Sequence, residues 1–581
     1  MRLSISESKN SKSLYVIKST YENGIRSTKI VEKLGTVDEL KKKLSGEDPI
    51  EWAHGYIAKL NRKEKEQTRE VMVSYSPVKM ISKGEQRSFN GGYLFLQKIY
   101  HELGLDKLCK EISEKYKFTY DLDSILSRLI YGRLLFPASK LATFELSGKL
   151  IEPPNFKLQH IYRALEYIAK EMDPLQAQLY QNSLKISKRK TGVLYYDLTN
   201  YFFEIEAEDG MQQYGYSKDH KPNPLVQMGL FMDGDGMPLA FDMADGNTNE
   251  QITLKPLEKR IISDFKLSKF VVCTDAGLSS TANRKFNDIG GRAFVTTQSI
   301  KKLKHHLKEW ALESEGWCLT GSKRVYDISK LDDEKYLDTF TGDKAEVKDK
   351  TFFKERWINE DGLQQRLIIT YSIKYRDYQR KIRDGQVRRA LRLIAKSPKK
   401  WKKANQNDFK RFIESKSFTK AGEEAKKEVL SIDSDLIAKE EIFDGFYGSC
   451  TNLEDDPQVI VKINKRRWEI EECFRIMKSE FKARPVHLSR DDRIKAHFMT
   501  CFITLLIYRI LEKKLSDEFT CHQIIDELRD MNFLKVPGEG YIPTYTRTSF
   551  TDALHEAFGF RTDYQIVTNK LMNNIFKTTK S

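Results

Sequence analysis

The run VLYYDLTNYFF, residues 193–203, decides the fold class of this chain. Aromatic and β-branched side chains fill the run, a composition typical of a buried strand. Asp197 lies at its centre, although acids are depleted from strands and are seldom buried without partners. No turn or helix cap in the run accounts for this aspartate. The run therefore predicts a core strand that carries a functional carboxylate.

The segments after this run alternate between strand and helix patterns. Two apolar runs, 225–233 and 237–245, flank the turn Gly234-Asp235-Gly236 and predict a hairpin. The segments that follow are expected to be a helix at 253–265, a strand at 269–277, a helix at 280–290 and a strand at 291–298. Three strands, a helix, a strand, a helix and a strand predict a mixed α/β domain.

Asp275 ends the strand pattern VVCT and precedes Ala276-Gly277. Taken alone, this position favours a turn aspartate or a cap for the next helix. A second functional carboxylate is the alternative interpretation, and the residue alone does not decide between the two.

Positive charge is concentrated in one part of the sequence. The formal net charge is +16, and the segment from Lys374 to Arg411 holds 15 Lys and Arg against 3 Asp and Glu. Such a cluster is the usual electrostatic footprint of nucleic-acid binding. A basic amphipathic helix is expected near 376–396, with a buried stripe formed by Val387, Ala390, Leu391 and Ile394. The residues expected to contact DNA are Arg380, Lys381, Arg388 and Arg389. A solvated helix face explains the same pattern, and both interpretations can hold together.

The length predicts several domains, because one hydrophobic core does not serve 581 residues. Residues 13–33 alternate around Asn23-Gly24 and predict a β-hairpin, and 92–185 has helical spacing throughout. That helical region fits a DNA-end-binding domain and a plain scaffold equally well. The expected regions are a hairpin with helices (1–80), a helical candidate for DNA-end binding (81–188), the first part of the α/β domain (189–296), an inserted domain with strands and the basic helix (297–455), the second part of the α/β domain (456–515) and a C-terminal segment (516–581).

Several classes of chemistry have no support in the sequence. The seven cysteines are scattered without C-x-x-C spacing, so neither a zinc ribbon nor a disulfide framework is predicted. A phosphate loop of the G-x-x-x-x-G-K type is missing, which argues against ATP hydrolysis. The most apolar run, Phe498–Ile507, is too short to span a bilayer and predicts a buried helix. We therefore expect no membrane segment.

A third acid, Glu471, lies in a helix expected to begin at residue 457. Alone, it would be one glutamate on a solvated face. With about 3.6 residues per turn, however, Arg467, Glu471 and Lys478 fall on one ridge beside the buried stripe, and Asn464 lies near them. A carboxylate flanked by cations next to a core suits a site for metal and phosphate. Phosphodiester cleavage at a two-metal site needs such carboxylates, and oxygen ligands favour Mg²⁺ or Mn²⁺.

The ridge resembles a known signature. Its pattern, Asn464-x2-Arg467-x3-Glu471-x6-Lys478, is similar to the Y-x2-R-x3-E-x6-K signature of DDE transposases of insertion-sequence family 4 and its relatives. YYDLTNYFFE and TDAGLSSTAN resemble the segments that bear the first and second aspartates of that family. The likeness covers about residues 190–512, with a weaker one through 90–150. Asn464 departs from the signature, which has tyrosine at this position.

The resemblance implies an RNase H-like catalytic domain, formed by 189–296 and 456–515 and interrupted by the insertion. Asp197, Asp275 and Glu471 would form the catalytic and metal-binding triad, with two Mg²⁺ or Mn²⁺ ions and with the carboxylates converging within metal-bridging distance. Asn464, Arg467 and Lys478 would contact DNA phosphates.

The implied activity is excision and integration of a mobile element. The expected partners are double-stranded DNA, as terminal inverted repeats and as target, and a second copy of the chain in a paired-end complex. The expected location is cytoplasmic, with the nucleoid of a bacterium or archaeon. Two alternatives stay open: an RNase H-like nuclease without strand transfer, and a domesticated DNA-binding protein without catalysis, which the intact triad disfavours.

Overall fold

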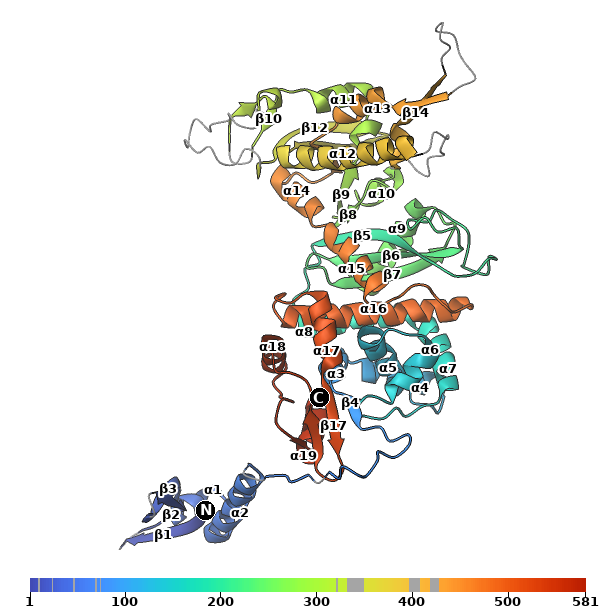
Figure 1. The fold of residues 1–581 in the computed structure, drawn as a ribbon. Helices are drawn as coiled ribbons and strands as arrows, with labels where there is room; N and C mark the ends of the chain where they lie inside the picture. The colour runs from blue at the N-terminus through green and yellow to red at the C-terminus, as the bar shows by residue number, and fades with distance from the viewer. Residues whose placement is uncertain are drawn as a thin grey trace. The chain divides into compact units, whose positions relative to one another are not determined.

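The computed structural model describes residues 1–8, 11–22, 25–44, 47–67, 70–73, 75–319, 322–331, 349–396, 408–417 and 428–581. The chain forms two compact units (Figure 1). The first comprises Met1–Glu85 with Val536–Glu539, and the second comprises Gln86–Lys535 with Gly540–Ser581.

The N-terminal unit is a small sheet with two helices. Its elements are β1 (Arg2–Ser8), β2 (Ser11–Glu22), β3 (Ile25–Thr36), α1 (Val37–Lys43) and α2 (Pro49–Gln67). β2 and β3 pair antiparallel, which confirms the hairpin predicted at 13–33, and β1 adds a third strand on β2. The expected turn at Asn23-Gly24 lies outside the described residues.

A helical region opens the second unit. It comprises β4 (Ser88–Asn90), α3 (Tyr93–Glu102), α4 (Leu105–Tyr116), α5 (Leu122–Leu135), α6 (Lys140–Ser147), α7 (Leu158–Lys170) and α8 (Met172–Ile186). These helices confirm the spacing seen through 92–185. Asp121 caps α5, because its carboxylate accepts from Ser124 N at 2.8 Å. α5 and α7 pack on the long helix α16 (Asp491–Lys514).

A ten-stranded sheet forms the centre of the second unit. Its strands, in spatial order, are β11 (Val325–Tyr326), β10 (Trp317–Cys318), β12 (Phe352–Glu360), β13 (Leu363–Tyr371), β16 (Phe446–Thr451), β9 (Ala293–Gln298), β8 (Val271–Thr274), β5 (Val193–Phe202), β6 (Leu225–Asp233) and β7 (Pro238–Asp245). β6 is antiparallel to both β5 and β7, whereas β8 and β9 run parallel to β5. The order β7-β6-β5-β8-β9 is that of an RNase H-like sheet, and the predicted mixed α/β class is confirmed.

The strands expected to form a separate inserted domain instead continue this sheet. β16 pairs with β9, and β13, β12 and β10 follow in antiparallel order. The helices of this region are α11 (His305–Leu312), α12 (Ile373–Lys396) and α13 (Ser434–Glu441), with a short hairpin of β14 (Ile413–Ser417) and β15 (Glu428–Ile432). Part of the basic segment, 397–407, lies outside the described residues.

Helices cover both faces of the sheet. α9 (Glu250–Asp264) packs on one face, against Leu194 and Tyr196 of β5. α10 (Thr281–Phe286) connects β8 to β9. α14 (Pro457–Lys465), α15 (Trp468–Ser479) and α16 follow the sheet in the sequence, and α15 and α16 pack on the opposite face (Figure 1). Its length and composition would let α16 cross a membrane, but 94% of its most apolar window is buried inside the protein. This burial agrees with the core helix predicted from its sequence.

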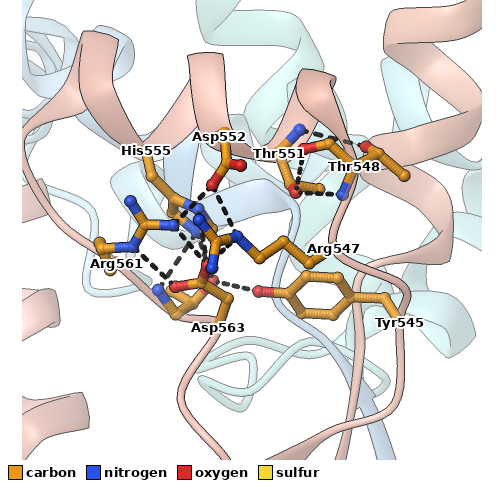
Figure 2. A network of polar contacts seen from close by, with 9 residues as sticks. Tyr545, Arg547, Thr548, Thr551, Asp552, His555, Arg561 and Asp563 are labelled. Carbon is orange, nitrogen blue, oxygen red and sulfur yellow. Dashed lines mark hydrogen bonds and ion pairs between the residues drawn. The ribbon is translucent and has the colours of Figure 1, made fainter.

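The C-terminal segment, which the sequence left unassigned, has its own elements. They are α17 (Cys521–Asp530), β17 (Asn532–Val536), β18 (Gly540–Pro543), α18 (Ser549–Phe558), β19 (Val567–Thr568) and α19 (Asn569–Thr579). The strands form a four-stranded sheet with β4. Beside α18, Arg561 donates to both Asp552 and Asp563, at 2.7 and 2.5 Å (Figure 2). Arg547 joins the same two carboxylates, at 2.8 and 3.5 Å, so every cation of this network has acidic partners.

Candidate functional site

The sheet places Asp197 and Asp275 side by side. In the parallel pairing of β5 with β8, Tyr195 lies opposite Cys273. The same offset, continued by two residues, brings Asp275 next to Asp197. Side chains two residues apart point to the same face of a strand, so both aspartates share the face of Tyr195 and Cys273.

That face lies against α14. The Tyr195 hydroxyl donates to the carbonyl of Ile463 at 3.0 Å, and the Cys273 thiol approaches Asn464 Oδ1 at 3.8 Å. The aspartates, one pleat further along their strands, therefore lie near the junction between α14 and α15.

The two aspartates are electrostatically coupled. Burial raises the pKa of Asp197 to about 6; the positive charge of Lys218 opposes the rise and the negative charge of Asp275 adds to it. Asp275 also makes the local contact that its position suggested, because its Oδ1 accepts from Leu278 N at 3.0 Å. The turn interpretation and the functional one are thus compatible.

Arg467 lies among all three acids of the predicted triad. It pairs with Glu471 at 3.5 Å, one helical turn away. Burial opposes its charge, yet the pKa of Arg467 is raised, by Tyr447 and by the carboxylates of Asp197, Glu471 and Asp275. The guanidinium therefore links the helix to the sheet aspartates through its positive charge.

The predicted single helix from residue 457 is wrong, because it breaks at Arg466 and Arg467. The Ile463 carbonyl, which would accept from Arg467 in a continuous helix, accepts instead from the Tyr195 hydroxyl and from Arg466 N. Arg467 N donates instead to Asn464 O at 3.2 Å, a tighter turn of the 3₁₀ type. The expected polar ridge is therefore divided between two helices.

Asn464 and Lys478, which were also predicted to bind DNA, have protein partners in this structure. Asn464 is 6% exposed, and its amide donates to Ser449 Oγ at 3.0 Å and to Tyr447 Oη at 3.2 Å. Lys478 lies 3.6 Å from Asp219, and burial lowers the pKa of Lys478. The structure thus gives Asn464 a packing role between α14 and β16, and ties Lys478 to the loop after β5.

The aspartate pair fits a divalent cation. Two adjacent carboxylates, one with a raised pKa, provide hard oxygen donors, and a cation between them would relieve their repulsion. Glu471 does not join them here. Its side chain is 59% exposed and pairs with Arg467. Within the described part of the chain, no group of three or more His, Cys, Asp or Glu side chains is placed to hold one metal ion. The expected convergence of all three carboxylates is therefore not seen.

A cavity of about 650 Å³ adjoins the helix side of this site. Glu471, Arg467 and Asn464 line it, together with Tyr447 and the exposed Trp468. Sequence reasoning missed Tyr447, whose hydroxyl lies where Asn464 and Arg467 meet. It also missed Lys218, whose ammonium donates to the carbonyl of Leu198 and whose charge acts on Asp197. The pattern FYGSCT predicts the strand that carries Tyr447, and the polar stretch around Lys218 indicates a connecting segment. Neither pattern predicts the contacts of these two side chains.

The basic helix α12 is only partly available to a ligand. Arg388 and Arg389 are exposed, and so is Lys381. Arg380 pairs with Asp444 at 3.6 Å. The expected stripe is wrong at Leu391, which is 51% exposed, whereas Ala390 is fully buried.

The sheet order and the paired aspartates define an RNase H-like α/β domain. Residues 317–507 match the family model described as "Transposase DDE domain". The matched segment contains Arg467 and Glu471, whereas Asp197 and Asp275 precede it. This match supports a transposase of the DDE class.

Comparison with solved structures also finds likenesses. One of them is the cryo-EM structure of a piggyBac transposase synaptic complex with hairpin DNA, at 9% identity and a TM-score of 0.36, over 85% of this chain and 88% of the other. Among curated proteins, no match was found.

Proposed function

We propose that this chain is a DNA transposase of the insertion-sequence family 4 type, which cleaves the ends of a mobile element and joins the 3′ ends to target DNA. The observation that carries the proposal is the β5–β8 register, which sets Asp197 beside Asp275, together with Arg467, whose charge interacts with both aspartates and with Glu471. The family match over 317–507 supports the class.

In this proposal Asp197 and Asp275 hold Mg²⁺ or Mn²⁺, and Glu471 completes the ligand set. Bound divalent ions would activate the attacking water or 3′-hydroxyl and stabilise the leaving oxygen. Arg467 orients Glu471 and neutralises the acids, and its guanidinium can also bind a phosphate through two hydrogen bonds. Lys218 keeps Asp197 ionised near neutral pH through its charge.

The substrate we propose is double-stranded DNA, with two copies of the chain joined in a paired-end complex. The location we propose is cytoplasmic and nucleoid-associated. The exposed Arg388, Arg389 and Lys381 of α12 would contact phosphates away from the reacting bond.

A strand-transfer assay tests the proposal. Linear duplexes that carry the DNA sequences flanking this gene, cut in advance at the 3′ ends, are incubated with a plasmid, Mg²⁺ and the full chain. We expect covalent joining to the plasmid, abolished by Asp197→Asn and kept by Asp242→Asn, another partly buried aspartate of the same sheet. Hydrolysis without joining would instead support the nuclease without strand transfer. An Asp197→Asn variant with full activity would contradict catalysis at this site.

A further inference from the structure

A second basic site lies between the helical region and the segment that follows α15. It is a cavity of about 280 Å³ whose floor is formed by Arg133 of α5, Lys140 of α6 and His497 of α16. These three side chains are 6%, 6% and 5% exposed. Lys482, Arg484 and His487 line it nearer the surface. None of the described residues that line this cavity is acidic.

The buried cations of the floor lack carboxylate partners among the described residues. Arg133 donates to the carbonyls of Phe481 and Ala138, at 3.1 and 3.3 Å, and its Nε has no partner. Lys140 Nζ contacts His497 Nδ1 at 3.5 Å. His497 Nε2 lies 3.2 Å from the carbonyl of Ala483, which can only accept, so Nδ1 is the acceptor from Lys140.

This arrangement is costly for the protein alone. Burial, and then the positive charge of Arg133, lower the pKa of Lys140 to about 7. Buried charges are normally paired, as Arg189 is with Asp233 and Arg383 is with Asp444 elsewhere in this protein. A buried cluster of cations without acids therefore points to a negative group supplied from outside the chain.

We propose that this cavity binds a phosphate group of DNA, with Lys140 and Arg133 as its buried cations and Lys482 at its mouth. Three features favour a phosphate. The site offers several N–H donors, its volume admits a tetrahedral anion, and Lys140 begins α6, whose N-terminus adds partial positive charge. The identification of DNA as the source rests on the proposed function.

The path from the candidate catalytic site supports DNA over a free anion. Arg484 of the cavity pairs with Asp219, and Lys478 of α15 approaches the same carboxylate at 3.6 Å. The cavity and the Glu471 helix thus each contribute a cation that pairs with Asp219, in the loop after β5. A duplex held at the catalytic acids could place a backbone phosphate over the cavity. This contact would fix the register of the duplex without depending on its base sequence.

Two measurements on the full chain test this inference. The first is the melting temperature in inorganic phosphate, compared with chloride at equal ionic strength. The second is duplex binding as a function of salt. The test variant is Lys140→Met, and the matched control is Lys149→Met, an exposed lysine just after α6. Lys482→Gln, at the exposed mouth, serves as the second test variant if Lys140→Met does not fold.

We expect phosphate to raise the melting temperature of the wild type and of Lys149→Met, but not of Lys140→Met. Without phosphate, Lys140→Met should be at least as stable as the wild type, because it removes an unpaired buried cation. We also expect Lys140→Met to lower the slope of log affinity against log salt by about one.

Three outcomes would overturn the inference. Equal phosphate stabilisation in Lys140→Met and the wild type would exclude the site. Phosphate stabilisation with an unchanged salt slope would make the ligand a free anion and not DNA. Strong destabilisation of Lys140→Met without phosphate, together with an unchanged response in Lys482→Gln, would assign a structural role to the cluster. A wild type that binds DNA but joins no ends would contradict the proposed function and leave these readouts intact.

Discussion

The two halves of the candidate catalytic site differ in how firmly the fold determines them. On the sheet, the β5–β8 register holds Asp197 and Asp275 together, and burial raises the pKa of Asp197 to about 6. On the helix, Glu471 is 59% exposed and pairs with Arg467 at 3.5 Å. The sheet half is preorganised, whereas the helix half is held by an exchangeable ion pair. Substitutions in the two halves should therefore differ in their effects on the joining rate and on stability.

The largest expected effect is loss of DNA joining in the sheet half. Asp197→Asn and Asp275→Asn should each lower the joining rate by roughly 100- to 1000-fold, the range seen when one preorganised electrostatic group is removed. Neither change should impair folding, because asparagine keeps the shape of the side chain. Single-turnover joining and thermal melting measure the two properties. If a folded variant lost only a little of its joining rate, the sheet aspartates would not be essential to the reaction.

The helix half should show a comparable loss of rate without a change in stability. Glu471→Gln removes a carboxylate that is mostly exposed, so its melting temperature should match that of the wild type. The control is Glu472→Gln, the next residue, which pairs with Arg475 at 2.7 Å and should keep full activity. If both variants joined DNA equally well, Glu471 would have no part in the reaction.

Arg467→Gln should give an intermediate effect, about tenfold in rate, through the acids it faces. Its charge lowers the pKa of Asp197, so its removal should raise that pKa further. The acid limb of the pH–rate profile should then move to higher pH. Arg466→Gln, which changes the neighbouring arginine, should leave the profile in place. If the acid limb of Arg467→Gln did not move, the charge of Arg467 would have no effect on the pKa of Asp197.

The remaining expected effect is on stability and not on rate. The pKa of Asp197 is raised above the ordinary value of 3.8, so the folded state binds a proton that the unfolded state has lost. The stability that this proton contributes is complete below pH 3.8, the ordinary pKa, and is lost as the pH rises through about 6, the pKa in the folded state. In EDTA, Asp197→Asn should gain up to roughly 3 kcal/mol over the wild type between pH 4 and 7. Urea unfolding across this range measures the difference, and a constant difference would contradict the raised pKa.

The sequence predicted the sheet half better than the helix half, for physical reasons. An acid within VLYYDLTNYFF and another after VVCT are local signals, and two parallel strands then bring them together. The break at Arg467 has no local signal. Its surroundings are non-local: the Ile463 carbonyl beside it accepts from the hydroxyl of Tyr195, more than 260 residues away. The continuation of the sheet through β16 and β13 likewise depends on non-local pairing, so the segment looked like a separate domain.

The resemblance to the transposase signature predicted Asn464, Arg467 and Glu471 as site residues, but it did not predict the contacts that they make. Asn464 occupies the signature tyrosine position and is buried against β16. Tyr447 of that strand places its hydroxyl 3.2 Å from the Asn464 amide and lines the same cavity as Arg467. An aromatic hydroxyl is thus present near the signature position, supplied by another element.

The most direct test of the central claim is to locate Mn²⁺ in the DNA-bound complex by anomalous diffraction. We expect Mn²⁺ between Asp197 and Asp275, with the carboxylate of Glu471 released from Arg467 and bound to the metal. Mn²⁺ elsewhere in the protein, or Glu471 still paired with Arg467 while the aspartates hold the ion alone, would contradict a shared three-carboxylate site.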